Sequence, residues 1–140
     1  MKIKHLIIVF IVMNNVQLLA CDCDEPTNTI EDFESGWQTS DFVLEVSILG
    51  SFQKSDVAVF ESVVLEAEVL TIYKGKISSR TIRIHTVYDG GGTCYFPFET
   101  GKSYLFYGMQ SDTGMFETSI CDRTGELKDK SFDLKLLSEK

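Results

Sequence analysis

The sequence has few basic residues: 13 lysines and arginines stand against 21 aspartates and glutamates, which gives a formal net charge of −8. A surface with this excess of negative charge repels phosphate backbones and anionic membranes. The composition therefore argues against nucleic acid as a partner.

Histidine is scarce as well, with two in the whole chain. One lies in the apolar leader described below. The other, His85, falls on the polar face of a predicted strand, where we expect an exposed surface side chain. A single histidine without a nearby cysteine nucleophile offers no acyl-transfer triad. We therefore expect no enzymatic activity, no cofactor and no metal bound by the chain itself.

Long apolar runs are confined to the N-terminus. Basic residues open the chain, residues 6–13 are apolar, and Ala20 supplies a small residue before Cys21. This is the order of a secretory signal, and its apolar segment is too short to cross a bilayer. We predict a signal peptide over 1–20 and one secreted domain over 21–140, since this length suffices for a single core.

Cysteine is limited to four positions, Cys21, Cys23, Cys94 and Cys121. An even number of cysteines in an exported chain indicates disulfides. The first two are separated by one residue, which puts them at the limit of disulfide reach in an extended strand. We expect each of them to pair with one of the two downstream cysteines. A zinc site is disfavoured, because metal knuckles space their cysteines by about two to four residues.

Apolar residues with helical spacing follow the cysteine pair. They predict a short helix over 29–37, capped by Thr27 or Asn28. The residues expected on its buried side are Ile30, Phe33 and Trp37. A second helix is expected within 127–137.

From Asp41 onward the apolar period changes to two, which indicates strands. We expect five of them, over 41–50, 57–73, 82–85, 104–109 and 115–120. The second is expected to place Val69 and Tyr73 on the same face. It would be longer than a small domain is wide, so it must bend or bulge. The fourth is apolar on both faces, as a strand covered on both sides would be. The pattern predicts an all-β fold with one or two short helices, a five-stranded OB-fold-like closed barrel.

Two further features have structural interpretations. The acidic cluster Asp22, Asp24 and Glu25 lacks the ligand pattern and the glycine of a calcium-binding loop, so we interpret it as a solvated terminus. Aromatic residues in 95–98 and 104–107 could stack bases on such a barrel. With so few basic residues in the chain, we assign them to the core.

The four cysteines stand among segments of a recognisable kind, namely DFVLEVSILG (41–50), VLTIYKG (69–75), GKSYL (101–105) and TSIC (118–121). In this combination the chain resembles the N-terminal, netrin-like domain of the tissue inhibitors of metalloproteinases, including the simpler bacterial members. The resemblance covers nearly all of 21–140, and the cysteine placement is its most specific part. It implies a five-stranded barrel with disulfides Cys21–Cys94 and Cys23–Cys121.

In inhibitory members of that family, the free amine and the carbonyl of the first cysteine chelate the catalytic zinc of a metalloprotease. Amine nitrogen and carbonyl oxygen close a five-membered ring around the metal and displace the water that would attack the substrate. The resemblance thus implies a secreted inhibitor whose partner is a zinc metalloprotease and whose chelating residue is Cys21. The other protease contacts that it implies are Asp22, Cys23, Asp24, Gly92 and Thr93.

The residues around Cys21 allow a second interpretation. Leu18-Leu19-Ala20-Cys21 also resembles a bacterial lipobox, in which the cysteine is lipidated on sulfur and acylated on nitrogen. Lipidation would consume the thiol needed for a disulfide and the amine needed for chelation. The alternative is a non-inhibitory, netrin-like binding module of the cell envelope, in contact with the membrane only through a lipid on Cys21.

Overall fold

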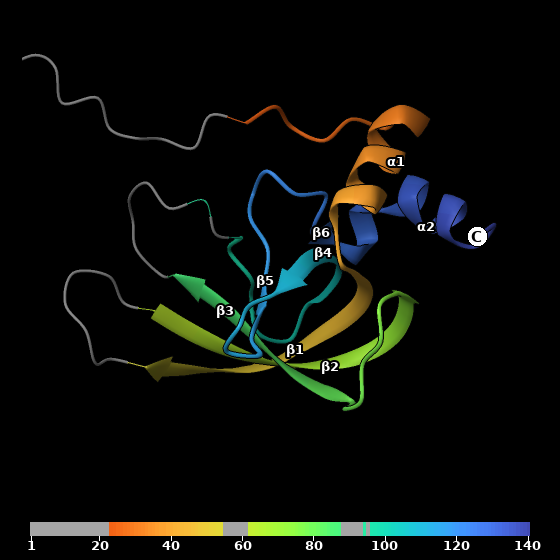
Figure 1. The fold of residues 1–140 in the computed structure, drawn as a ribbon. Coiled ribbons are helices and arrows are strands. Elements are labelled where there is room, and N and C mark those ends of the chain that lie inside the picture. The colour runs from red at the N-terminus through yellow and green to blue at the C-terminus, as the bar shows by residue number, and fades with distance from the viewer. Residues whose placement is uncertain (1–22, 55–61, 88–93, 95) are drawn as a thin grey trace, which may run out of the picture.

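The computed structural model describes residues 23–54, 62–87, 94 and 96–140 (Figure 1). In chain order its elements are α1 (Ile30–Thr39), β1 (Phe42–Lys54), β2 (Ser62–Lys74), β3 (Thr81–Val87), β4 (Ser103–Gln110), β5 (Phe116–Glu117), β6 (Gly125–Glu126), a 3-10 turn (Leu127–Asp129) and α2 (Ser131–Leu137). Neither α-helix in this part of the chain is long and apolar enough to cross a bilayer.

Five strands close into a barrel, which confirms the expected fold class. The order is β1-β2-β3-β5-β4, and β4 pairs back onto β1 to close the ring. All neighbours are antiparallel except β3 and β5, which are parallel. The short strand β6 adds to β4 beyond β5. Both helices lie at one end of the barrel, beside the segment that leads into α1 (Figure 1).

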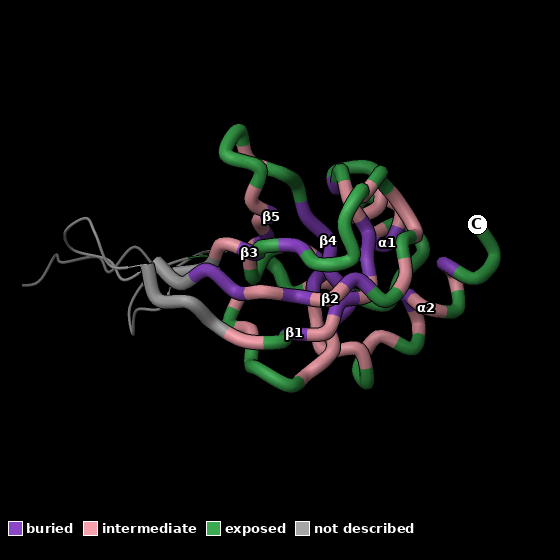
Figure 2. The backbone as a smooth tube through the Cα atoms, turned by 90° about the horizontal axis from the view of Figure 1, so that it is seen from below, coloured by how far each residue is buried: buried purple, intermediate pink, exposed green. Residues whose placement is uncertain are grey.

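The hydrophobic core has two parts, and β1 and β4 contribute to both. Buried residues, purple in Figure 2, lie along the strands. One set of side chains fills the barrel, with Leu44, Val46 and Ile48 from β1, as the alternation predicted. Tyr104 and Phe106 of β4 join this set. The second set fills the layer between barrel and helices and consists of Phe33, Val43, Leu105, Tyr107 and Leu137. The expectation that β4 is covered on both sides is therefore confirmed.

The β1–β2 ladder bends through three register shifts, as the length of the second strand required. Leu65, Ala67 and Val69 point into the barrel. At the register shift after Val69, Leu70 has no partner residue on β1 and is 48% exposed. The alternation of inward and outward side chains along β2 is interrupted there. Tyr73 packs in the helix layer, so the prediction that it shares a face with Val69 is wrong. The predicted start of this strand at residue 57 lies outside the described residues.

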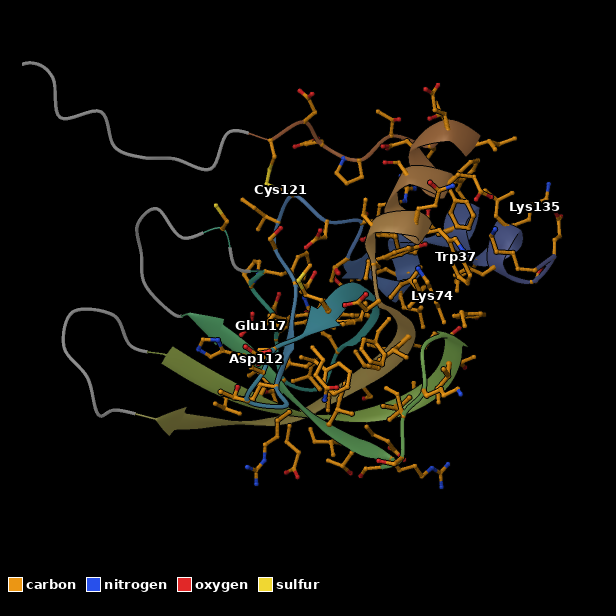
Figure 3. All side chains as sticks on the ribbon, viewed as in Figure 1. Trp37, Lys74, Asp112, Glu117, Cys121 and Lys135 are labelled. Atoms are coloured by element: carbon orange, nitrogen blue, oxygen red, sulfur yellow. A yellow bond between two sulfur atoms is a disulfide. The ribbon has the colours of Figure 1, made fainter. Side chains whose placement is uncertain are left out.

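The N-cap of helix α1 lies one or two residues later in the sequence than predicted. Thr29 is the N-cap, and its side chain accepts a hydrogen bond from the Asp32 N–H. Phe33 is buried as expected, but Ile30 is 65% exposed. At the other end of the helix, Lys74 Nζ donates to the carbonyl oxygens of Trp37, at 2.6 Å, and Ser40. The same ammonium lies 5.5 Å from the Trp37 ring (Figure 3), so the end of β2 anchors the helix C-terminus.

Two predictions on the barrel wall need correction. The fifth strand is reduced to Phe116–Glu117, because Thr118 turns inward and donates a hydrogen bond to the Tyr107 carbonyl at 2.6 Å. His85 is half-buried rather than exposed, and its Nδ1 lies 3.4 Å from Glu117 Oε1. The first difference arises from the contact of β5 with β4 and the second from its contact with β3, and the sequence pattern of one strand alone encodes neither.

The close approach of β4 and β5 predicts the effect of Gly108→Ala. A Cβ atom at Gly108 would lie 2.2 Å from the carbonyl oxygen of Glu117. We expect the free energy of unfolding to fall by about 1–3 kcal/mol, as overpacking does elsewhere, in urea denaturation with the disulfides intact. At Gly50 the same addition meets nothing within 4 Å, so Gly50→Ala is the matched control. Equal stability of the two variants would contradict the described β4–β5 contact.

Candidate functional site

A disulfide holds Cys23, which stands two positions after Cys21, the predicted chelating residue. Cys23 and Cys121 are bonded, with their Cα atoms 5.4 Å apart and a sequence separation of 98 residues. This confirms one of the two predicted bridges. A loop of this length corresponds to about 4 to 5 kcal/mol in the chain-entropy model, and the bond indicates an oxidising compartment. The segment that follows Cys21 is thereby fastened to the loop after β5.

Cys94 lies beside the same loop. Its carbonyl oxygen accepts a hydrogen bond from the Ile120 N–H at 2.7 Å, and Ile120 is the residue before Cys121. Cys94 also takes part in a disulfide. Cys21, the partner that the resemblance implies, lies outside the described residues. Cys94 and Cys23 are therefore both attached to the loop after β5.

The predicted contact residues are only partly described. Cys23 and Asp24 belong to the described chain, and Asp24 is exposed. Cys21, Asp22, Gly92 and Thr93 lie outside the described residues, so their roles stay predictions. Their described neighbours in sequence, Cys23 and Cys94, are both disulfide-bonded.

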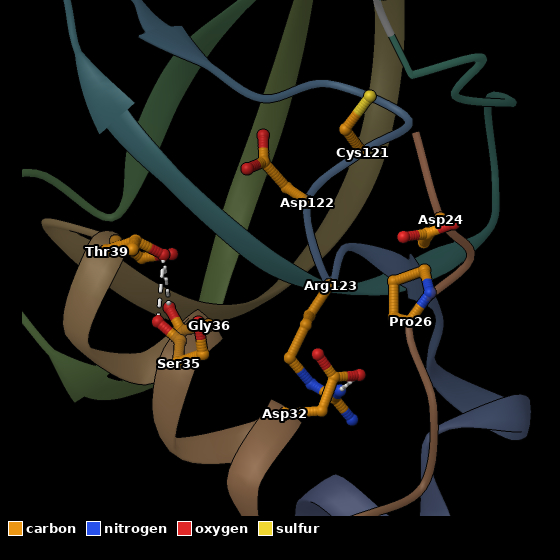
Figure 4. A pocket seen from close by; sticks show the side chains of 10 residues that line it. Asp24, Pro26, Asp32, Ser35, Gly36, Thr39, Cys121, Asp122 and Arg123 are labelled. Carbon is orange, nitrogen blue, oxygen red and sulfur yellow. Dashed lines mark hydrogen bonds and ion pairs between the residues drawn. The ribbon is translucent and has the colours of Figure 1, made fainter. Parts of the chain in front are cut away.

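A small cavity of about 110 Å³ separates the N-terminal segment from α1 and the loop after β5 (Figure 4). Three carboxylates line it, those of Asp24, Asp32 and Asp122. A neighbouring open hollow is lined by Asp24, Glu25, Glu31 and Asp32 with two threonines. In the described part of the chain, no group of three or more histidine, cysteine or carboxylate side chains is arranged to hold a metal ion. We call the residues Asp24, Glu25, Glu31, Asp32 and Asp122 the acidic edge.

Arg123 lines the same cavity, although no sequence pattern marks it as a site residue. Its side chain is 4% exposed. Nε and Nη2 donate to the two oxygens of Asp133, at 3.0 and 2.6 Å. Nη1 donates to Asp32 Oδ2 at 2.8 Å and to the Thr27 carbonyl at 2.9 Å. One guanidinium therefore joins the N-terminal segment, α1, the loop after β5 and α2.

The hydrogen-bond network continues from Asp133 into the barrel wall. Asp133 Oδ2 accepts a hydrogen bond from the Tyr107 hydroxyl at 2.9 Å. Burial, together with the carboxylate of Asp133, raises the pKa of Tyr107 well above its ordinary value. Tyr107 N–H in turn donates to Thr124 Oγ1 at 2.9 Å. The acidic edge is therefore supported by a buried polar network that ends on β4.

One sequence signal could have identified this network. Asp133 stands four positions before Leu137 in the terminal helix, and both are buried. A carboxylate on the apolar side of a helix requires a buried cation or hydrogen-bond donors. The sequence does not say which basic residue supplies the charge, because Arg123 follows no periodic pattern.

Comparison with models of known protein families gives no match, and comparison with curated proteins gives none either. The structure itself shows a small closed barrel with two helices and a Cys23–Cys121 disulfide.

The buried ion pair predicts a non-additive effect on stability. Asp133→Leu leaves the Arg123 guanidinium buried without its bidentate partner, and we expect a loss of about 3–5 kcal/mol in the free energy of unfolding. The double variant Arg123→Met, Asp133→Leu removes both charges and should be more stable than the single variant. Urea denaturation of the disulfide-intact proteins measures both. A double variant less stable than Asp133→Leu would contradict the pairing.

The acidic edge also predicts a pH dependence through Asp32. Hydrogen bonds from the Thr27 N–H and hydroxyl, with the nearby Arg123 guanidinium, hold the pKa of Asp32 below its ordinary value of 3.8. A lowered folded-state pKa stabilises the fold above the unfolded-state value, and this stabilisation is lost as the pH falls through the folded-state pKa. We expect Asp32→Asn to be less stable than the unmodified protein at pH 7, with a smaller difference below about pH 4. A constant difference across this range would exclude the contribution.

Proposed function

We propose that the chain is a secreted inhibitor of zinc metalloproteases whose Cys21 amine and carbonyl bind the catalytic zinc of the protease. The observation that carries the proposal is the Cys23–Cys121 disulfide beside Cys94. A chelating terminus must be held in place, because ordering a free chain end on binding would consume much of the binding free energy. The bridge holds the residue two positions after Cys21.

The chemistry of such a terminus is favourable near neutral pH. An α-amino group has an ordinary pKa of about 7.7–8.0, so the neutral form that binds zinc is readily reached. The amine and carbonyl would occupy the position of the zinc-bound water that attacks the substrate. Inhibition would then require no reaction of the inhibitor itself.

The acidic edge indicates the kind of protease that would be recognised. Asp24, Glu25 and Glu31 line one hollow close to the first described residues of the chain, and Arg123, which lines the neighbouring cavity, is buried. Complementary charge across an interface raises the association rate. Asp22 would enter the specificity pocket, where a carboxylate without a partner costs several kcal/mol. We infer a target with basic residues around its cleft and a cation in that pocket.

The lipid-anchored binding module is the alternative function. Cys23 and Cys121 are bonded to each other and Cys94 is bonded as well, so a second bridge within one chain would have to join Cys94 to Cys21. A lipidated Cys21 has no thiol for such a bridge. The disulfide at Cys94 therefore favours the inhibitor over the lipoprotein.

A one-residue extension tests chelation. The full chain, with and without an alanine inserted between Ala20 and Cys21, would be exported from a secreting host and purified. Inhibition would be measured against zinc endopeptidases that carry a lysine or arginine in their specificity pocket. We expect the unmodified protein to inhibit, and the extended form to lose at least about 100-fold in potency, because its first amine is displaced from the zinc. Equal potency, or no inhibition by the unmodified protein, would contradict the proposal.

Two controls accompany this comparison. Urea denaturation should give the same curve for both forms, which assigns the loss to the terminus and not to the fold. Intact mass before and after reduction and thiol capping should show that the unmodified form starts at Cys21 and the extended form at the inserted alanine. Each form should lie four hydrogens below its fully reduced mass. A mass increased by a diacylglycerol and an acyl chain would instead identify the lipid-anchored module.

A further inference from the structure

The Cys23–Cys121 disulfide lies at the surface of the molecule. Cys121 is exposed, whereas Cys23 is half-buried. Cys121 also lines the small cavity between the N-terminal segment, α1 and the loop after β5 (Figure 4). Exchange between a thiol and a disulfide requires access to one of the two sulfur atoms. The Cys121 side therefore offers a thiolate from solution a route to this bridge.

Two carboxylates flank the bridge. Asp24 follows Cys23 directly in sequence, Asp122 follows Cys121, and both carboxylates line the same cavity as Cys121. Within the described part of the chain, neither of them takes part in an ion pair. Asp122 Oδ2 accepts a hydrogen bond from the Ser119 N–H at 2.7 Å, which fixes its position on the loop. Each end of the bridge therefore has an uncompensated negative charge beside it.

The other charged groups near the cavity do not cancel this negative charge. Arg123 is the one cation among the described residues that line it, and it pairs with two carboxylates, those of Asp32 and Asp133. Two glutamates line the adjacent hollow. An α-amino group on a chain that starts at Cys21 would be offset by Asp22, the next residue. A surplus of negative charge therefore surrounds the bridge and acts on ions within about one Debye length.

Thiol–disulfide exchange brings a charged reactant to this surface. The attacking thiolate sulfur forms a bond to Cys121 Sγ, the bond between the two Sγ atoms breaks, and Cys23 leaves as a thiolate that takes up a proton from water. The attacking sulfur is oxidised and the Cys23 sulfur is reduced. Because the attacking thiolate is itself negative, the carboxylates repel it. A second negative charge on the same thiol increases this repulsion, whereas a positive charge offsets it.

We propose that the Cys23–Cys121 bridge is a thiol-exchange site that selects thiols with a positively charged group and that the acidic edge rejects thiols with an additional negative group. An aminothiol would form a mixed disulfide with Cys121, while a thiol that carries a carboxylate or a sulfonate would be excluded. The tether of the N-terminal segment would thus open to one chemical class of reductant. This selection concerns the bridge and its flanking carboxylates, so it is independent of the proposed inhibition.

Small thiols of different charge provide the test. The probes are 2-aminoethanethiol, 2-mercaptoethanol and 2-mercaptoethanesulfonate, whose second groups are cationic, neutral and anionic. Each is added at about pH 8 to the disulfide-intact protein exported from the full chain. Acid quenching, thiol capping and peptide mass mapping then give the rate of the first exchange at Cys23 or Cys121. Each rate is divided by the rate of the same thiol with a neutral small disulfide, which removes differences in thiol pKa and nucleophilicity.

The corrected rates decide the proposal. At an ionic strength of about 20 mM, we expect a rate at least about 10-fold higher for the aminothiol than for the sulfonate, with the neutral thiol between them. At an ionic strength of about 500 mM, screening should reduce this ratio to below about 3. Equal corrected rates for the three thiols at low ionic strength would overturn the proposal.

Charge-neutral variants assign the selection to the acidic edge. The double variant Asp24→Asn, Asp122→Asn keeps a hydrogen-bond acceptor for the Ser119 N–H and should reduce the ratio at low ionic strength at least about 3-fold. Asp112→Asn is the matched control, because Asp112 lies well apart from Cys121 (Figure 3), and it should leave the ratio unchanged. The single variant Asp24→Asn, at an exposed position, should give an intermediate ratio without any change in the loop. An unchanged ratio in both the double and the single variant would overturn the role of the acidic edge.

Discussion

The buried pairing of Arg123 with Asp133 is the interaction on which the arrangement of this molecule depends. A guanidinium that is 4% exposed is tolerated only with its partners in place. Those partners come from the segment before α1, from α1 itself and from α2. The helices therefore take fixed positions on the barrel for an electrostatic reason as well as a hydrophobic one. The Tyr107 hydroxyl extends the same constraint to β4, where the two parts of the core meet.

The barrel was predictable where its determinants are local. Alternation along Phe42–Ile48 and the doubly apolar run of β4 each report directly on burial, and the structure places both as expected. The place of Tyr73 in the helix layer was not predictable, because a bulge depends on the register of two strands, whereas periodicity describes only one. For the same reason the shortness of β5 and the contact of His85 with Glu117 follow from neighbours that are distant in sequence.

In the candidate site, the disulfide was predictable from the sequence and the buried arginine was not. The pairing of Cys23 with Cys121 followed from a resemblance, since spacing alone left the connectivity open. Arg123 could not be found from sequence, because a charged residue is expected at the surface unless its counter-ion is known.

The loop after β5 has a mechanical consequence. Cys121 carries the covalent link to the N-terminal segment, and Arg123, two positions later, carries the ion pairs to both helices. A pull on the N-terminal segment therefore enters this loop through a sulfur–sulfur bond and leaves it through the guanidinium toward α1 and α2. The same loop runs directly into β5 and β6. A partner that grips the terminus would therefore load both helices together with these strands, and no single element would carry the whole force.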